Sequence, residues 1–145
     1  MQIDNHLSQN TTIMTYLKHL LHTYPVACFY ILIIWVLCFA SIPETPLDNV
    51  RLIDKWVHSA MYLGTCLTIW IEYLRKHSVE KTSLKRLLAL AWIAPILMSG
   101  LIEILQANCT GGRRSGEWLD FAANSIGATL AAAIGVIILY YRKRR

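Results

Sequence analysis

The sequence predicts an all-α membrane protein, a bundle of four transmembrane helices with its N and C termini in the cytoplasm. Of the 145 residues, 55% are hydrophobic and only 16% are charged, and long apolar runs recur four times along the chain. A soluble domain usually has about a quarter charged residues. Four helices of roughly 20 residues, the length that crosses a bilayer, would use more than half of the chain. We therefore expect no separate catalytic domain. The spans are expected at about residues 24–40, 56–73, 87–105 and 121–141.

The first two runs differ in polarity. Residues 24–40 contain no charge and end before the proline-containing stretch 41–46. The second run has His58 near its start and Glu72 near its end as its strongly polar residues. Glu72 is expected near the inner interface, where a snorkelling carboxylate needs no function.

The third run contains Pro95, which should kink its helix, and carries Glu103 almost at its end. Segments 31–37 and 130–139 are apolar all round, as lipid-facing helices should be. A soluble four-helix bundle would instead show polar stripes at helical spacing, and they are absent. Membrane insertion is the better interpretation.

Outside the four-helix membrane domain, residues 24–141, we expect an N-terminal cytoplasmic segment, residues 1–23, and a basic cytoplasmic tail, residues 142–145. Residues 1–13 are polar and without pattern, and we assign them no role. The first run resembles the core of a signal peptide, but it is long for one and ends in a poor cleavage context, so we expect it to be retained.

The distribution of Lys and Arg predicts the orientation. Ten lie before the first span, in the loop 74–86 or in the tail, whereas four lie in the other two loops. By the positive-inside rule the termini and the middle loop are cytoplasmic, and the first and third loops face outward. Topology and attraction to anionic lipid explain the basic segments, so no nucleic-acid partner is expected.

With this orientation, polar residues of three spans should meet near the outer face. They recur on one side of each helix, at intervals of three or four residues. The three stripes are Asp54, His58 and Tyr62; Gly100, Glu103 and Gln106; and Asp120, Asn124 and Gly127.

These residues form an ordered pattern: Asp54-Lys55-x-x-His58-x-x-x-Tyr62, Glu103-x-x-Gln106, Arg114-Ser115 and Asp120-x-x-x-Asn124-x-x-Gly127-Ala128. The pattern resembles that of the VanZ-like family of small bacterial integral membrane proteins. Such proteins tend to have a further glycine where this chain has Ala131, which keeps the small size.

The resemblance implies a multi-pass protein of the bacterial inner (cytoplasmic) membrane, part of the cell envelope, in a family named for an accessory protein linked to glycopeptide antibiotic resistance. It brings no agreed catalytic mechanism. Arg113 stands beside Arg114, so either arginine fits that motif position. The residues at the motif positions, expected to form a ligand-binding polar cluster, are Asp54, Lys55, His58, Tyr62, Glu103, Gln106, Arg114, Asp120 and Asn124.

Structural roles compete with ligand binding at most of these positions. Asp54 and Asp120 stand where helices begin and suit capping. Lys55 suits snorkelling to the interface, and Asn124 and Gln106 suit interhelical hydrogen bonding. The small residues Gly127, Ala131 and Gly135 indicate close helix packing. Glu103 and His58 need partners inside the membrane, because an ionisable group there costs on the order of 3 kcal/mol.

Three functions remain open. The first is binding of an anionic lipid-linked or peptidoglycan-related headgroup at the outer leaflet, where two helix N-termini, Lys55, Arg113 and Arg114 would attract phosphate. The second is an enzyme with His58 as general base, although Ser115 and Cys109 make poor nucleophiles and no catalytic residue can be named. The third is a structural subunit whose polar cluster only holds helices together. No metal site or cofactor is expected; the expected partners are membrane lipids and a lipid-linked cell-wall precursor, and the oligomeric state is open.

Overall fold

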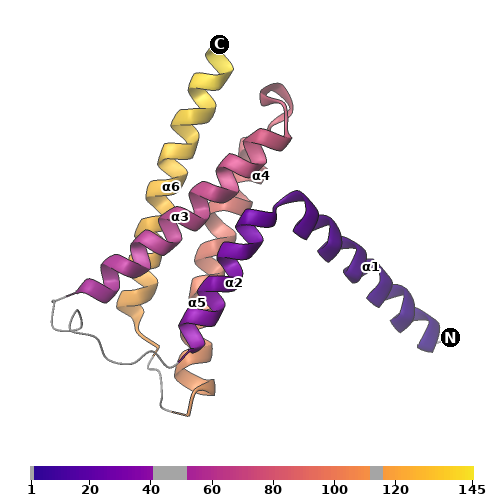
Figure 1. The fold of residues 1–145 in the computed structure, drawn as a ribbon, viewed down its shortest axis with the longest axis vertical. Helices are drawn as coiled ribbons and strands as arrows, with labels where there is room; N and C mark the ends of the chain where they lie inside the picture. The colour runs from indigo at the N-terminus through magenta and orange to yellow at the C-terminus, as the bar shows by residue number, and fades with distance from the viewer. Residues whose placement is uncertain (1, 41–51, 112–115) are drawn as a thin grey trace.

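The computed structural model describes residues 2–40, 52–111 and 116–145, with the backbone alone for residues 2–11 and 81. Every regular element in these ranges is a helix, so the predicted all-α class is confirmed. Figure 1 shows α1 projecting away from the other long helices, which lie together. The elements are α1 (Gln2–Thr23), α2 (Pro25–Phe39), α3 (Ile53–Lys76), η2 (Val79–Lys81), α4 (Leu84–Leu88), η3 (Ala89–Ile93), α5 (Ala94–Cys109) and α6 (Trp118–Arg144).

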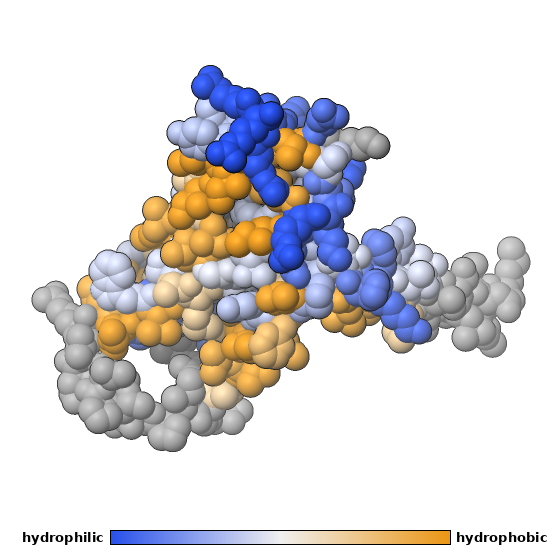
Figure 2. All heavy atoms as spheres, turned by 45° about the horizontal axis from the view of Figure 1, so that its top comes forward, coloured by the Kyte–Doolittle hydropathy of each residue, from blue (hydrophilic) through white to orange (hydrophobic). Residues whose placement is uncertain are grey.

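Two continuous helices are long and apolar enough to cross a membrane, Leu84–Cys109 and Trp118–Arg144. The segments Thr12–Thr23 and Pro25–Phe39 pass the same test only as a pair, and they meet at a bend of 106°. Figure 2 shows hydrophobic surface over the body of the molecule and hydrophilic residues gathered at the end that carries the C-terminus. The chain thus has two helices that could cross a membrane, or three if the bent pair counts as one span.

The first expected span, residues 24–40, corresponds to α2, which is one residue shorter at each end and is also short for a helix that crosses a bilayer. α2 has 15 residues, so it is about 22 Å long at 1.5 Å per residue, less than the roughly 30 Å hydrocarbon core. The break at Tyr24, which has φ −128° and ψ 58°, separates it from α1. The helical form of residues 2–23 was not predicted: residues 1–13 were interpreted as polar and without pattern, and residues 1–23 only as an N-terminal cytoplasmic segment.

The second expected span lies within α3, which does not pass the apolar test. Its middle carries polar side chains, among them His58, Thr65 and Thr68, which lower its mean hydropathy. The two threonines have local partners, since the hydroxyls of Thr65 and Thr68 donate to carbonyls one turn earlier, at 2.8 Å each. α3 packs against α2, α6 and the π-helical turn η3. α3 is therefore an inner helix, with neighbours on several sides.

The third expected span is continuous from Leu84 to Cys109 and contains a π-helical turn, Ala89–Ile93, directly before Pro95. Proline has no N–H to donate to the carbonyl four residues earlier. A π turn lengthens the repeat by one residue, and here the Ala94 N–H donates to the Ala89 carbonyl. The structure thus has a π turn directly before Pro95, and the kink expected at this proline stays a prediction.

α3 and α6 form the most extensive helix pair, and small residues on α6 allow their close approach. Gly127, Ala131 and Gly135 are all buried. A Cβ atom on Gly127 would collide with the Ser59 carbonyl, and one on Gly135 would collide with the Trp70 ring. The predicted small-residue face is confirmed, and its partner is α3.

Polar side chains from neighbouring helices hold both ends of the apolar helix α2. The carboxylate of Glu72 accepts hydrogen bonds from the backbone N–H groups of Val26 (3.1 Å) and Ala27 (2.9 Å). At the other end, the side-chain amide of Gln106 donates to the Cys38 carbonyl at 2.8 Å. The expectation that Glu72 only snorkels was wrong, since it caps a helix N-terminus where a negative charge is also favourable.

Candidate functional site

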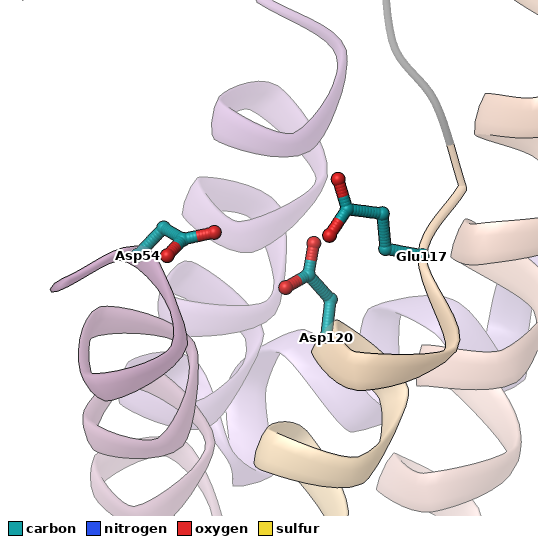
Figure 3. A group of neighbouring side chains, drawn as sticks. All are labelled: Asp54, Glu117 and Asp120. Atoms are coloured by element: carbon teal, nitrogen blue, oxygen red, sulfur yellow. The ribbon is translucent and has the colours of Figure 1, made fainter. Parts of the chain in front are cut away.

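Lys55 stands at the centre of a charged cluster where α3 and α6 begin. Its Nζ lies 2.6 Å from Asp54 Oδ2, 2.7 Å from Glu117 Oε2 and 2.5 Å from Asp120 Oδ1. Asp54 belongs to the first turn of α3, Glu117 is the residue before α6, and Asp120 lies in the first turn of α6. Figure 3 shows the three carboxylates turned toward one another. One ammonium therefore joins the starts of two helices.

The cluster ranges from exposed to nearly buried. The side chains of Lys55 and Asp120 are 15% and 14% exposed, whereas those of Asp54 and Glu117 are 57% and 46% exposed. A hydrogen bond from Lys55 lowers the pKa of Asp54. Burial disfavours the charged form of Lys55, but hydrogen bonds to Asp120, Asp54 and Glu117 outweigh it and raise the pKa of the ammonium. All these contacts favour the charged forms of Lys55 and Asp54.

The same three carboxylates have the spacing of a cation site, because one oxygen from each of Asp54, Glu117 and Asp120 lies within 4.8 Å of the others. Carboxylate oxygens are the ligands that Ca²⁺ and Mg²⁺ prefer. Here the ammonium of Lys55 contacts all three carboxylates, so the chain itself supplies a positive charge between them.

A series of polar side chains leads from this cluster into the bundle. His58 Nε2 lies 3.8 Å from Asp120 Oδ2, and His58 Nδ1 lies 3.2 Å from Asn124 Oδ1. The amide nitrogen of Asn124 donates to Ser99 Oγ at 2.8 Å. Because the Asn124 oxygen then faces His58, Nδ1 of the imidazole is the donor. The other nitrogen, Nε2, is turned toward Asp120.

Glu103, 8% exposed, ties α5 to the start of α6. Its Oε2 accepts a hydrogen bond from the Glu117 backbone N–H at 2.9 Å. The neighbouring Gly116 lies so close to α5 that a Cβ atom there would collide with the Glu103 carbonyl. The buried carboxylate of Glu103 therefore has a hydrogen-bond donor, the backbone N–H of Glu117. The same hydrogen bond holds the backbone of Glu117 in place beside Lys55.

Two of the predicted site residues do not join the group around Lys55. Gln106 binds the end of α2, as described above. Tyr62 is buried in the apolar cluster with Ile34 and Ile102; its hydroxyl lies near that of Ser99 but makes no well-formed hydrogen bond among the described residues.

Asp54 and Asp120 lie in the first turns of α3 and α6, whereas the residues before these helices are Leu52 and Glu117, whose side chains do not cap them. The carboxylate of Asp54 binds Lys55 and also accepts hydrogen bonds from the first-turn N–H groups of Asp54 and Lys55, so the capping role considered for it agrees with the structure. Asp120 binds Lys55. Arg113, Arg114 and Ser115, which were expected to complete the site, lie outside the described residues.

The sequence analysis did not predict two residues of the site, Glu117 and Ser99, although both follow the spacing that it used. Glu117 precedes Asp120 by three residues and Asn124 by seven, and Ser99 precedes Glu103 by four, so the spacing places each in line with predicted residues. Glu117 was treated only as part of a loop, and Ser99 was passed over as a small polar residue.

Comparisons of this chain with models of protein families, with curated proteins and with solved structures find no match.

The chemistry of the cluster around Lys55 indicates which ligands it could bind. With three carboxylates and one ammonium, the cluster formed by Asp54, Lys55, Glu117 and Asp120 has a net negative charge. The cluster therefore suits ligand groups that donate hydrogen bonds or carry positive charge. Its ammonium, Lys55, already contacts the three carboxylates.

Proposed function

We propose that this chain is a VanZ-like protein of the bacterial cytoplasmic membrane that binds the headgroup of a lipid-linked or peptidoglycan-related envelope precursor. The binding site is the cluster around Lys55, together with His58 and Asn124. The observation that carries the proposal is the continuity of polar side chains, from the charged cluster through half-buried His58 to buried Asn124. Ionisable groups within membrane helices are costly, and they commonly mark functional sites.

The proposal includes four spans, with both termini in the cytoplasm and the cluster facing outward. α3 would be the fourth span although it is less apolar than the others, because its polar side chains are turned toward neighbouring helices. The basic residues at the ends of α3 and α6 lie at the opposite end from the cluster. By the positive-inside rule that basic end is cytoplasmic.

The described residues favour the sugar and peptide parts of such a ligand. Carboxylates accept hydrogen bonds from hydroxyl and amino groups, and His58 Nε2 offers a further polar atom beside Asp120. The phosphate part needs cations, and Lys55 is already held by three carboxylates. That role falls to Arg113 and Arg114 in the adjoining loop, as their place in the sequence suggests. The family resemblance makes tolerance to a glycopeptide antibiotic the expected physiological outcome.

A binding experiment tests the proposal. The purified protein in detergent is titrated with a polyprenyl diphosphate carrying the peptidoglycan disaccharide-peptide, and separately with the polyprenyl diphosphate alone, using native mass spectrometry. We expect His58→Ala and Asn124→Ala to weaken binding of the first ligand roughly three- to tenfold, the loss of one hydrogen bond of about 1 kcal/mol. Binding of the second ligand should change little.

The matched controls are His77→Ala and Asn108→Ala. His77 stacks on Tyr73, and Asn108 donates only within its own helix, to the Ile104 carbonyl. Both controls should bind the complete ligand as the parent does. If the site variants also bind like the parent at equal purity, the cluster is not the binding site.

One observation favours an enzyme as the second candidate. Asn124 accepts the hydrogen bond of His58 Nδ1 and so orients the ring. This leaves Nε2, on the side of Asp120, as the nitrogen that a general base would use to take a proton from a substrate. Conversion of the complete precursor by the purified protein, lost in His58→Ala and kept in His77→Ala, would favour catalysis. Binding without conversion over long incubation would favour the first candidate.

A further inference from the structure

Helix α1 has an apolar side that no other part of the described structure covers. Ile13, Met14, Leu17, Leu20 and Leu21 are each between 48% and 57% exposed. At 3.6 residues per turn these five positions fall within about 120° of arc. They follow the spacing of an amphipathic helix. We call this surface the α1 apolar face.

The opposite side of α1 is polar. Thr12, Thr15, Lys18, His19 and His22 occupy the remaining arc, and all five are exposed. A transmembrane helix that faces lipid is apolar all round, as α2 is, whereas a helix with one apolar and one cationic or polar side lies in the membrane interface. The composition of α1 therefore favours a position on a membrane surface over a position across it.

The junction between α1 and α2 supports the same position. The two helices meet at 106°. This angle differs from a right angle by 16°, a difference comparable to the average tilt of about 20° of membrane helices. A helix at this angle to a membrane-crossing neighbour runs along the bilayer plane. The Leu20 carbonyl accepts from the Tyr24 N–H at 2.7 Å, and Glu72 holds the first N–H groups of α2. The bend is thus tied to α3.

The charges around this junction match an anionic membrane. The start of α2 lies beside the end of α3, because the Glu72 carboxylate accepts hydrogen bonds from the N–H groups of Val26 and Ala27. α6 ends there too, because Arg142 donates to the Leu74 carbonyl at 3.1 Å. The last turns of α3 and α6 are basic, and they complement the negative surface of a leaflet that contains anionic lipid.

We propose that α1 is an interfacial helix that inserts the α1 apolar face into the headgroup region of an anionic lipid leaflet, at the basic end of the bundle. The occupant of this face is lipid, not a second copy of the chain or a soluble protein. The helix would hold the start of the short helix α2 at the membrane surface. This inference is independent of the ligand that the Lys55 cluster binds.

Photo-crosslinking in vesicles tests it on the full chain with its native cysteines. Benzoylphenylalanine replaces Leu17 on the α1 apolar face, or Thr15 on the polar side as the matched control. The vesicles contain phosphatidylcholine with or without phosphatidylglycerol, and adducts are identified by mass. Leu32, which is 61% exposed on α2, serves as the positive control for lipid contact.

We expect a lipid adduct at position 17 with a yield several-fold above that at position 15, and a further increase when phosphatidylglycerol is present. An adduct between two copies of the chain at position 17 would overturn the proposal in favour of a dimer. Equal lipid yields at positions 15 and 17 would show lipid on both sides of α1, as for a helix that crosses the membrane. No lipid adduct at position 17 while position 32 gives one would place α1 in water. Either result would overturn the proposal. Both substituted sites are exposed, so folding of the bundle does not depend on them.

Discussion

Lys55 joins three carboxylates that would otherwise repel one another. Two of them, Asp54 and Asp120, come from different helices, and Glu117 stands directly before α6. An isolated surface ion pair contributes little to stability, but this cluster differs, because Lys55 and Asp120 are only 15% and 14% exposed, so little water can replace the ammonium at Asp120. The side chain of Lys55 should therefore contribute more to the stability of the bundle than its position near the start of α3 suggests.

The variant Lys55→Met should lower the free energy of unfolding by about 1–3 kcal/mol, since it leaves charged acceptors without their donor. Thermal unfolding in detergent measures the effect. Millimolar Ca²⁺ should restore part of the lost stability in this variant and not in the parent, because three carboxylates would then be free to hold the ion. Lys76→Met, at an exposed position, is the control and should change stability little.

The pH dependence of the cluster follows from the two shifted groups. Lys55 lowers the pKa of Asp54, so the stabilising contribution of this carboxylate is present above its ordinary pKa of about 3.9 and is lost as the pH falls below it. The raised pKa of Lys55 gives a contribution that is present below about 10.4 and is lost at higher pH. The cluster should stabilise the bundle throughout the neutral range.

Comparison with Asp54→Asn isolates the acid side of this profile. The variant should be slightly less stable than the parent at pH 7, by less than about 1 kcal/mol because Asp54 is largely exposed. The two melting curves should converge as the pH falls below about 4. A difference that stays constant from pH 7 to pH 3 would show that Asp54 acts through something other than its charge.

At the scale of helices, the capping of α2 by Glu72 should stabilise the junction with α1. Glu72→Leu removes the acceptor of two backbone N–H groups, and loss of a helix cap costs about 0.5–2 kcal/mol. Hydrogen exchange followed by mass spectrometry should show faster exchange at Val26 and Ala27. Glu80→Leu, in the short helix η2, should leave these amides unchanged, and equal exchange in Glu72→Leu and the parent would contradict the cap.

The pairing of α3 with α6 depends on glycines where the backbones approach closely. Gly127→Ala should destabilise the bundle by about 1–3 kcal/mol, because the new Cβ atom would collide with the Ser59 carbonyl, which is backbone and cannot rotate away. Gly64→Ala is the matched control. It lies in α3 with no atom within 4 Å of its added Cβ, so it should be neutral or stabilising through helix propensity. Similar effects at both glycines in thermal unfolding would rule out the packing explanation.

For the whole molecule, the sequence predicts what depends on periodicity and composition. Hydropathy locates the cores of α2, of the helix Leu84–Cys109 and of α6, and intervals of three and four place Asp54, His58, Asp120 and Asn124 on faces that meet. Residue size predicts the face of Gly127 and Gly135 as well. These features are local, so they can be recognised along a single helix.

Contacts between distant segments could not be predicted in this way. Glu72 and Val26 are 46 residues apart, and Gln106 and Cys38 are 68 residues apart, so their hydrogen bonds depend on which helices become neighbours. Gln106 follows Glu103 by three residues, and this spacing alone does not distinguish a side chain that faces the charged cluster from one that faces the end of α2. The first span was expected to begin at residue 24, where the break lies, but the bend there between two helices was not predicted.

Orientation is the feature of the whole molecule on which the proposed ligand depends. Cys109 ends α5 at the same end of the bundle as the Lys55 cluster, and it is the exposed cysteine of the four, Cys28 being partly buried and Cys38 and Cys66 buried. If the cluster faces outward, a membrane-impermeant maleimide applied to intact cells should label Cys109, and Cys109→Ser should abolish the labelling. Labelling that requires disruption of the membrane would place the cluster in the cytoplasm. An outer-leaflet precursor could not then reach it, whereas the helix packing and the ion pairs described above would stand.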